Sequence, residues 1–324
     1  MRAMLPDGRR IGAHLPLGRG MVQAVERAHE LGLDTLQVFS DNPTAWRRRT
    51  EPPRELPAFQ DRLVALDMGP IAIHAAYLVN LAGPDPVLFE QSCAALASEL
   101  RVAPGFRARY VNVHTGSHRG SGVAAGTARL ADGVARVLAE VQDGPATPLL
   151  ILENSAGSGD GLGVTLEELA GILDAIAALG IAAHRVGICL DTAHLWGAGF
   201  DIGDADGVER LLGEFEGRIG LDRLHMVHFN DSKVALGSKM DRHEHVGAGS
   251  IGPIGLGALL RHPRLAHTTF YLETPGMDEG YDSINAGRML DLAGGRPLAE
   301  LPAGAATVRG SRSRTAPAGD EGQR

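Results

Sequence analysis

Short runs of branched aliphatic residues recur along the chain and alternate with longer stretches in which apolar residues are spaced three or four apart. The spacing in stretches such as "MVQAVERAHELG" and "TLEELAGILDAIAALG" predicts amphipathic helices, and the short runs predict buried strands. The predicted strands are Arg10–His14, Thr35–Phe39, Ile71–His74, Arg109–His114, Leu149–Glu153, Val186–Asp191, Leu224–Asn230 and Thr269–Glu273. Regular alternation of strand and helix is typical of an α/β protein with a parallel sheet.

Eight strands separated by helices predict a closed (β/α)8 TIM barrel, a fold of about 250 residues. An open, doubly wound sheet is the alternative, but its first strand-to-helix turn usually carries a GxGxxG motif. The corresponding turn here, "HLPLGRG", lacks that motif, which favours the barrel. We expect one barrel domain over residues 1–301 and a disordered tail over residues 302–324, because the tail is rich in Ala, Gly, Ser and Arg and has little to bury.

Composition narrows the functional classes. The chain has 324 residues, 44% of them hydrophobic and 22% charged, as is usual for a soluble globular protein. No apolar run approaches the roughly 18 residues of a membrane span, and the first residues lack the apolar centre of a signal peptide. We therefore expect a cytoplasmic protein without membrane association, in which Cys93 and Cys189 are buried thiols. The net charge of −8 argues against binding nucleic acid by bulk charge, so a polyanionic ligand would require a locally positive site.

Each predicted strand from the third to the eighth carries, at or near its end, a side chain that can bind a metal. These residues are His74, His114, Glu153, Asp191, His228 and Glu273. The carboxyl ends of barrel strands converge on one face, where the active sites of this architecture lie. Taken singly, a histidine or glutamate at a strand end is more often a hydrogen-bonded structural residue. The complete set on one face instead predicts a metal centre.

Two further segments add potential ligands. "DTAH" places His194 three residues after Asp191, and "MDRHEHVGAGSIG" provides Asp241 and His243 on a glycine-rich loop. Burying so many carboxylates and imidazoles together is costly unless cations neutralise them, and the set exceeds what one tetrahedral ion can use. Imidazole and carboxylate without thiolate suit zinc, manganese or iron(II). We expect two or three ions, with Glu244 and His245 facing solvent or supporting the ligands from behind.

Long motifs in the chain resemble those of the endonuclease IV family of apurinic/apyrimidinic endonucleases. They are "GAHLPLGRG", "IHAAYLVNLAGP", "VNVHTGSH", "LILENSAGSGDGLG", "GICLDTAHLWGAGFDI", "HFNDSKVALGSKMDRHEHVGAGSIG" and "YLETPG". They occur in the family's order from about Gly12 to Glu273, which is nearly all of the predicted barrel.

The resemblance implies a xylose-isomerase-like TIM barrel that holds three zinc ions. It implies that His74 and His114 bind the first ion and that Glu153 bridges the first and second. Asp191, His228 and Glu273 would complete the second site, and the third would comprise His194, Asp241 and His243. The implied reaction is hydrolysis of the phosphodiester 5′ to an abasic site in duplex DNA, leaving a 3′-hydroxyl and a 5′-deoxyribose phosphate. We take Glu153 and Glu273 as catalytic candidates as well as ligands, and expect a monomer.

The resemblance also indicates DNA contacts. Tyr77 and Leu78 match the family residues that insert into DNA at the damaged site, and Arg242 is a candidate phosphate contact. Thr44 stands where some members carry an inserted arginine, so Arg47, Arg48 or Arg49 is a candidate replacement. Ala248 also replaces a common glutamate.

Two other functions fit parts of the pattern. Xylose-isomerase-like sugar isomerases and epimerases also gather Glu, Asp and His around divalent ions, but they do not require the additional set of His194, Asp241 and His243. A barrel that only binds damaged DNA is the non-enzymatic alternative. Thr44 favours that alternative weakly, whereas the complete ligand set favours an enzyme.

Overall fold

The parallel strands form a closed barrel in this computed structural model, which describes residues 7–141, 143–144, 147–277 and 279–305. Its strand order is β1-β10-β7-β6-β5-β4-β3-β2, and β2 pairs with β1 to close the sheet. The barrel strands are β1 Ile11–His14, β2 Thr35–Val38, β3 Ile71–His74, β4 Ala108–His114, β5 Leu149–Glu153, β6 Val186–Asp191, β7 Leu224–His228 and β10 Thr269–Leu272. The predicted TIM barrel is thus confirmed.

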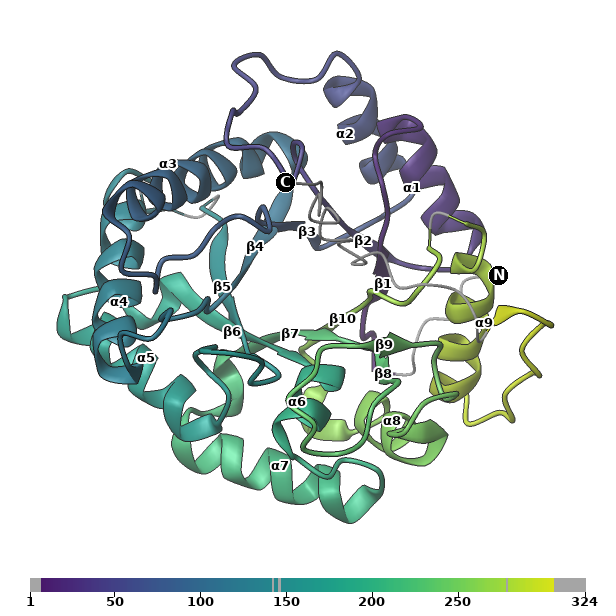
Figure 1. The fold of residues 1–324 in the computed structure, drawn as a ribbon. Helices are drawn as coiled ribbons and strands as arrows, with labels where there is room; N and C mark the ends of the chain where they lie inside the picture. The colour runs from purple at the N-terminus through teal and green to yellow at the C-terminus, as the bar shows by residue number, and fades with distance from the viewer. Residues whose placement is uncertain (1–6, 142, 145–146, 278, 306–324) are drawn as a thin grey trace, which may run out of the picture.

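The helices surround the barrel (Figure 1). They are α1 Met21–Glu30, α2 Leu56–Ala65, α3 Pro86–Val102, α4 Val123–Ala139, α5 Leu166–Ala178, α6 Thr192–Ala198, α7 Ala205–Arg218, α8 Gly252–Leu260 and α9 Asp282–Ala293. N-cap side chains fix the first residue of several helices. Asp85, Thr165 and Asp204 accept hydrogen bonds from backbone amides in the first turns of α3, α5 and α7.

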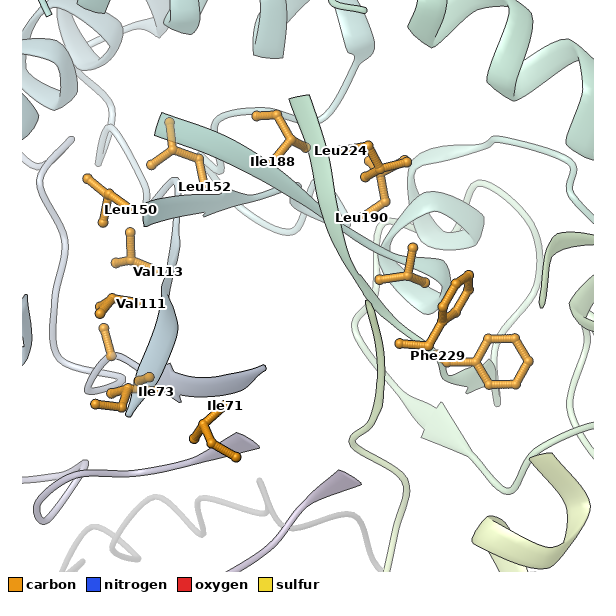
Figure 2. Packing of buried hydrophobic residues seen from close by; sticks show 14 of the residues in the cluster. Ile71, Ile73, Val111, Val113, Leu150, Leu152, Ile188, Leu190, Leu224 and Phe229 are labelled. Carbon is orange, nitrogen blue, oxygen red and sulfur yellow. The ribbon is translucent and has the colours of Figure 1, made fainter. Parts of the chain in front are cut away.

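Side chains alternate between the two surfaces of the barrel wall, as the two-residue period of a strand requires. Val111, Val113, Leu150 and Leu152 belong to the large apolar cluster formed with the helices, and Figure 2 shows them along β4 and β5. The intervening residues form a separate buried cluster inside the barrel. Its members are Ala72, Tyr110, Leu149, Ile151, Cys189, Met226 and Tyr271. Two residues further along several of these strands lie the predicted ligands.

A short hairpin, β8 Asp231–Ser232 and β9 His243–Glu244, interrupts the connection between β7 and α8. It lies beside the barrel near α6 and α8 (Figure 1). Two glycines permit close backbone approaches here: a Cβ on Gly249 would lie 2.3 Å from the Ser232 carbonyl oxygen, and one on Gly197 would lie 2.9 Å from that of Met240. The glycine-rich loop is therefore packed against β8 and α6 rather than projecting into solvent.

The element bounds differ from the predicted ones by one or two residues. Glu273 follows the last strand instead of ending it, and β7 stops at His228. Both cysteines are buried, as predicted. Residues 302–305 of the predicted tail are described, and the Ala305 side chain is buried; residues 306–324 lie outside the described residues. Within the described ranges, no helix is both long and apolar enough to cross a membrane.

Candidate metal centre

The carboxyl ends of the strands bring the predicted ligands together on one face. In register, His114 is paired with Glu153 on the neighbouring strand, and Asp191 is paired with His228. Among the described residues there are three groups of potential ligands, and within each group the ligand atoms all lie within 4.8 Å of one another. The groups are His74, His114 and Glu153; Glu153, Asp191, His228 and Glu273; and Asp191, His194 and His243.

Glu153 joins the first group to the second. Its Oε2 lies 3.5 Å from His74 Nε2 and 3.4 Å from His114 Nε2. Its Oε1 lies 3.3 Å from Nδ1 of His228, which in turn is 3.3 Å from Oε2 of Glu273. One carboxylate thus presents an oxygen to each of two adjacent ligand groups, which is the arrangement of a bridging ligand.

Asp241 from the glycine-rich loop lies beside the third group. The Asp241 oxygens lie 3.3 Å from His194 Nε2 and 3.1 Å from His243 Nε2. Asp191 Oδ2 is 3.5 Å from His243 Nε2, so Asp191 connects the second group to the third. The loop therefore brings Asp241 and His243 to His194, as the sequence predicts. The shared position of Asp191 was not predicted.

Backbone carbonyls fix the orientation of the histidine rings. The Nδ1 atoms of His74, His194 and His243 lie 2.7, 2.9 and 2.8 Å from the carbonyl oxygens of Ala75, Asn154 and Glu273. With Nδ1 engaged, Nε2 is directed toward the carboxylates. Such hydrogen bonds to the second ring nitrogen set the tautomer of metal-binding histidines.

Side-chain amides hold the carboxylates and the remaining histidine. Asn112 donates to Glu153 Oε2 at 2.6 Å, and Asn230 donates to Asp191 Oδ2 at 2.7 Å. Gln37 donates to Glu273 Oε1 at 2.7 Å, while its Oε1 lies 3.0 Å from His228 Nε2. Gln37 therefore turns His228 so that Nδ1 faces the site.

His14 is a site residue that the sequence reasoning missed. Its Nδ1 lies 3.1 Å from Glu273 Oε1, at the end of β1. The sequence did indicate His14, because the first predicted strand also ends in a side chain that can bind a metal. The amide side chains of Gln37, Asn112 and Asn230 left no such signal, since they are not expected metal ligands at such a site.

The acids and imidazoles of the rim shift one another's protonation. Burial disfavours the charged form of Glu153, but His114 and His228 hold its pKa well below the usual value. Burial likewise opposes protonation of His194 and His243, yet Asp191 and Asp241 raise their pKa values to about 10 and about 9. Without metal, protons on His194, His228 and His243 neutralise part of the charge on the buried carboxylates.

The residues fit a set of divalent cations. Glu153 Oε1, His74 Nε2, His228 Nδ1 and His243 Nε2 are buried and have no hydrogen-bond partner within the described part of the chain. Buried polar atoms are nearly always satisfied, whereas each of these faces another charged or ring atom of the rim at 3.1–3.5 Å. Nitrogen and carboxylate oxygen donors without thiolate suit zinc, manganese or iron(II). A metal ion in each group would satisfy these atoms and replace the protons.

The predicted DNA contacts lie around this centre. Tyr77 is 40% exposed, and its ring lies 5.8 Å from that of His74. Leu78 beside it is half-buried, and Arg242 is exposed and donates to the Asp241 carbonyl oxygen. The Thr44 amide and hydroxyl both donate to Asn42 Oδ1, so this threonine stabilises its own loop. Nothing in the structure explains alanine at position 248.

The expectation that His245 could face solvent is wrong. It is fully buried, and its ring nitrogens lie 3.0 Å from Asn285 Nδ2 and 3.0 Å from the Ala305 carbonyl oxygen. Glu244 is partly buried and lies 3.8 Å from Lys233. His245 thus attaches the C-terminal segment to the loop that carries His243, a contact between distant segments that has no periodic signature.

Comparison with known proteins gives the same class as the fold and the rim. Residues 25–291 match the family model described as "Xylose isomerase-like TIM barrel". "Probable endonuclease 4" of Methanoculleus marisnigri is 40% identical over 88% of this chain and 99% of that protein, and its namesake from Halothermothrix orenii is 37% identical over 85% and 98%.

Solved structures agree. Endonuclease IV from Thermus thermophilus superposes with a TM-score of 0.71 at 37% identity, covering 82% of this chain and 92% of that one. A D-tagatose 3-epimerase-like protein shares the fold, with a TM-score of 0.64 over 88% of this chain and 96% of that one, but only 18% identity. The protein is therefore a xylose-isomerase-like TIM barrel with a metal-competent rim. Within that class, the chain belongs to the endonuclease IV family.

Proposed function

We propose that this protein is a zinc-dependent endonuclease of DNA base excision repair. It hydrolyses the phosphodiester 5′ to an abasic site and leaves a 3′-hydroxyl and a 5′-deoxyribose phosphate. The observation that carries the proposal is the third ligand group, where His194 and His243 lie together next to the other two groups and Asp241 contacts both histidines. The names of the relatives, which are endonucleases, support it.

The proposal assigns roles to residues of the rim. His74, His114 and Glu153 hold one ion; Glu153, Asp191, His228 and Glu273 hold the second; and His194, Asp241 and His243 hold the third. Zinc bound there supplies Lewis acidity toward phosphate oxygens and lowers the pKa of water. The ions also provide the local positive charge that a protein of net charge −8 otherwise lacks.

The remaining roles belong to the surrounding side chains. Glu153 and Glu273 place negative charge beside the reacting centre, where Asn112 and Gln37 fix their orientation. Tyr77 and Leu78 wedge into the duplex at the lesion, which exposes the abasic nucleotide to the rim. Arg242 contacts a phosphate and contributes affinity rather than lesion specificity. We propose that the chain acts as a monomer.

The test is incision of a duplex that carries one abasic site, resolved on a denaturing gel with an intact duplex as control. We expect incision 5′ to the lesion that stops after chelation and returns when zinc is added. Metal analysis of the active sample is expected to give about three zinc ions per chain.

The epimerase alternative makes the opposite prediction. A sugar-processing enzyme would leave the abasic duplex intact despite full metal loading, and would convert one of a panel of free ketoses instead. A barrel that only binds damaged DNA would retain the abasic duplex in a gel-shift assay without cutting it. Either result contradicts the proposed hydrolysis.

A further inference from the structure

The loop between β2 and α2 forms one side of the rim and touches the predicted DNA wedge. The Tyr77 amide donates to the Pro43 carbonyl oxygen at 3.1 Å. At the start of the same loop, the Phe39 ring packs edge-on against Tyr77, with 5.1 Å between ring centroids. Phe39 also lies 5.6 Å from His74. The position of this loop therefore determines where Tyr77 sits relative to the metal centre.

Glu99, a buried acid on α3, contacts this loop at two points. The Glu99 side chain is only 3% exposed and accepts a hydrogen bond from the Ser40 hydroxyl. Its Oε1 lies 3.5 Å from Arg48 Nη1, and the Arg48 side chain is 11% exposed. Arg48 Nη1 also donates to the Asn42 carbonyl oxygen at 3.2 Å. One carboxylate thus binds the loop at its beginning and near its middle.

The three consecutive arginines of the loop have different surroundings. Arg48 is turned inward to Glu99, whereas Arg49 is exposed and its amide donates to Asp41 Oδ2 at 2.6 Å. Arg47 is exposed and has no ion pair within the described ranges. Because burying an arginine and a glutamate is costly unless they pair, we take Arg48 to be held by Glu99 and the Asn42 carbonyl rather than free to bind a phosphate, although its Nε and Nη2 are buried without a hydrogen-bond partner within the described ranges.

We propose that Glu99, through Arg48 and Ser40, is a positioning residue for abasic DNA: it sets the β2–α2 loop and thereby places Tyr77 over the metal centre. The inference rests on the proposed function. Among the described residues, the Glu99 side chain forms hydrogen bonds or ion pairs only with Ser40 and Arg48 and interacts with the ligand His74 only through its charge, so we expect its loss to leave metal binding intact. Burial raises the pKa of Glu99, which shows that the pair with Arg48 and the bond from Ser40 only partly offset the desolvation of this acid.

Whether Glu99 holds the β2–α2 loop is tested without DNA by limited digestion with trypsin, which cleaves after arginine. In Glu99→Gln the loop is released, and we expect cleavage after Arg47, Arg48, Arg49 or Arg54 to accelerate by about tenfold or more. Glu90→Gln is the matched control, because it removes the same charge from the same helix but breaks only the exposed ion pair with Arg136. It is expected to be digested like the parent protein.

The substrate part is tested by steady-state kinetics and by equilibrium binding to abasic and intact duplexes. Glu99→Gln is expected to raise KM and to weaken abasic-duplex binding by roughly tenfold to a hundredfold, since small displacements of a positioning group have effects of that size. Zinc content and kcat at saturation stay unchanged. A merely structural role would lower kcat and metal content together. Ser40→Ala and Arg48→Lys, which are milder changes, are expected to show the same pattern to a smaller degree.

The outcomes separate the two proposals. If Glu99→Gln and both milder variants resist trypsin and bind abasic duplex like the parent, the positioning role is wrong. In the Glu99→Gln, Arg48→Gln double variant, the loss must be smaller than the sum of the single losses; additive losses would contradict the pair. If the parent protein neither incises nor prefers abasic duplex, the proposed function fails, and the positioning of DNA fails with it. The trypsin result still decides whether Glu99 anchors the loop.

Discussion

Two layers of the barrel interior, stacked along the same strands, have opposite chemistry. The inner layer is apolar or weakly polar and includes Ile151, Cys189 and Tyr271. Two residues further along the chain from these three come Glu153, Asp191 and Glu273. Both layers are buried, but of these two, within the described residues, only the rim layer contains buried polar atoms that hydrogen bonds leave unsatisfied. The same strands therefore contribute packing to the stability of the barrel in the inner layer and potential metal ligands in the rim layer.

The largest expected effect is a change at the rim that preserves shape. Glu153→Gln removes the charge that faces two ligand groups, so turnover on abasic duplex is expected to be lost and bound zinc to fall. Metal analysis and the incision assay measure both. Glu140→Gln, an exposed site on the outer surface that pairs with Arg101, serves as control and is expected to keep both properties. Full turnover in Glu153→Gln would remove the bridging role.

A change in the inner layer should affect stability instead. Tyr271 is fully buried, and its hydroxyl donates to the Pro70 carbonyl oxygen at 2.6 Å. Tyr271→Ala is expected to lower the free energy of unfolding by about 3–5 kcal/mol, and Tyr271→Phe by about 0.5–1.5 kcal/mol, because one hydrogen bond is lost while the Pro70 carbonyl still accepts from the Thr35 hydroxyl. Denaturant unfolding of metal-loaded samples measures both. Zinc per folded chain should not change in Tyr271→Phe; a loss of zinc would show that the two layers are not separable.

The pH dependence of stability should distinguish metal-free from zinc-loaded protein. The pKa values of His194 and His243 are raised to about 10 and about 9, above an unfolded value of about 6.5. Their contribution to stability is therefore complete below about pH 6.5 and is lost as pH rises through 9 to 10. Metal-free protein is expected to lose thermal stability over that window, while zinc-loaded protein, in which ions replace those protons, loses less. Melting temperatures that fall equally with pH in the metal-free and the zinc-loaded samples would contradict this.

The smallest effect is expected at the exposed edge of the rim. Tyr77→Ala removes a ring that contacts Phe39 and His74, and we expect it to weaken binding of abasic duplex by about 1–3 kcal/mol. Binding of intact duplex should change less if Tyr77 inserts at the lesion, as we propose. Titrations of both duplexes at one salt concentration give the comparison. Equal losses on both would make Tyr77 a structural residue.

The sequence predicted the barrel and the ligand rim because both depend on short-range regularities. A strand's period and its last residue are readable, and the convergence of strand ends follows from the fold, so His74 through Glu273 could be placed in advance. Contacts between distant segments could not be read in this way. The pairing of Glu99 with Arg48, the burial of His245 against Ala305, and the sharing of Asp191 between two groups depend on how loops pack. His14 is the exception that a fuller reading of strand ends would have found.

The most direct test of the central claim is X-ray diffraction from zinc-loaded crystals at the zinc absorption edge, which locates each ion by its anomalous signal. The account predicts a peak in each of the three ligand groups, with ligand atoms at about 2.0–2.2 Å. Glu153 should contact two of the ions. A single peak, or zinc bound away from the rim, would contradict the account and leave the rim as a network of protonated histidines and carboxylates.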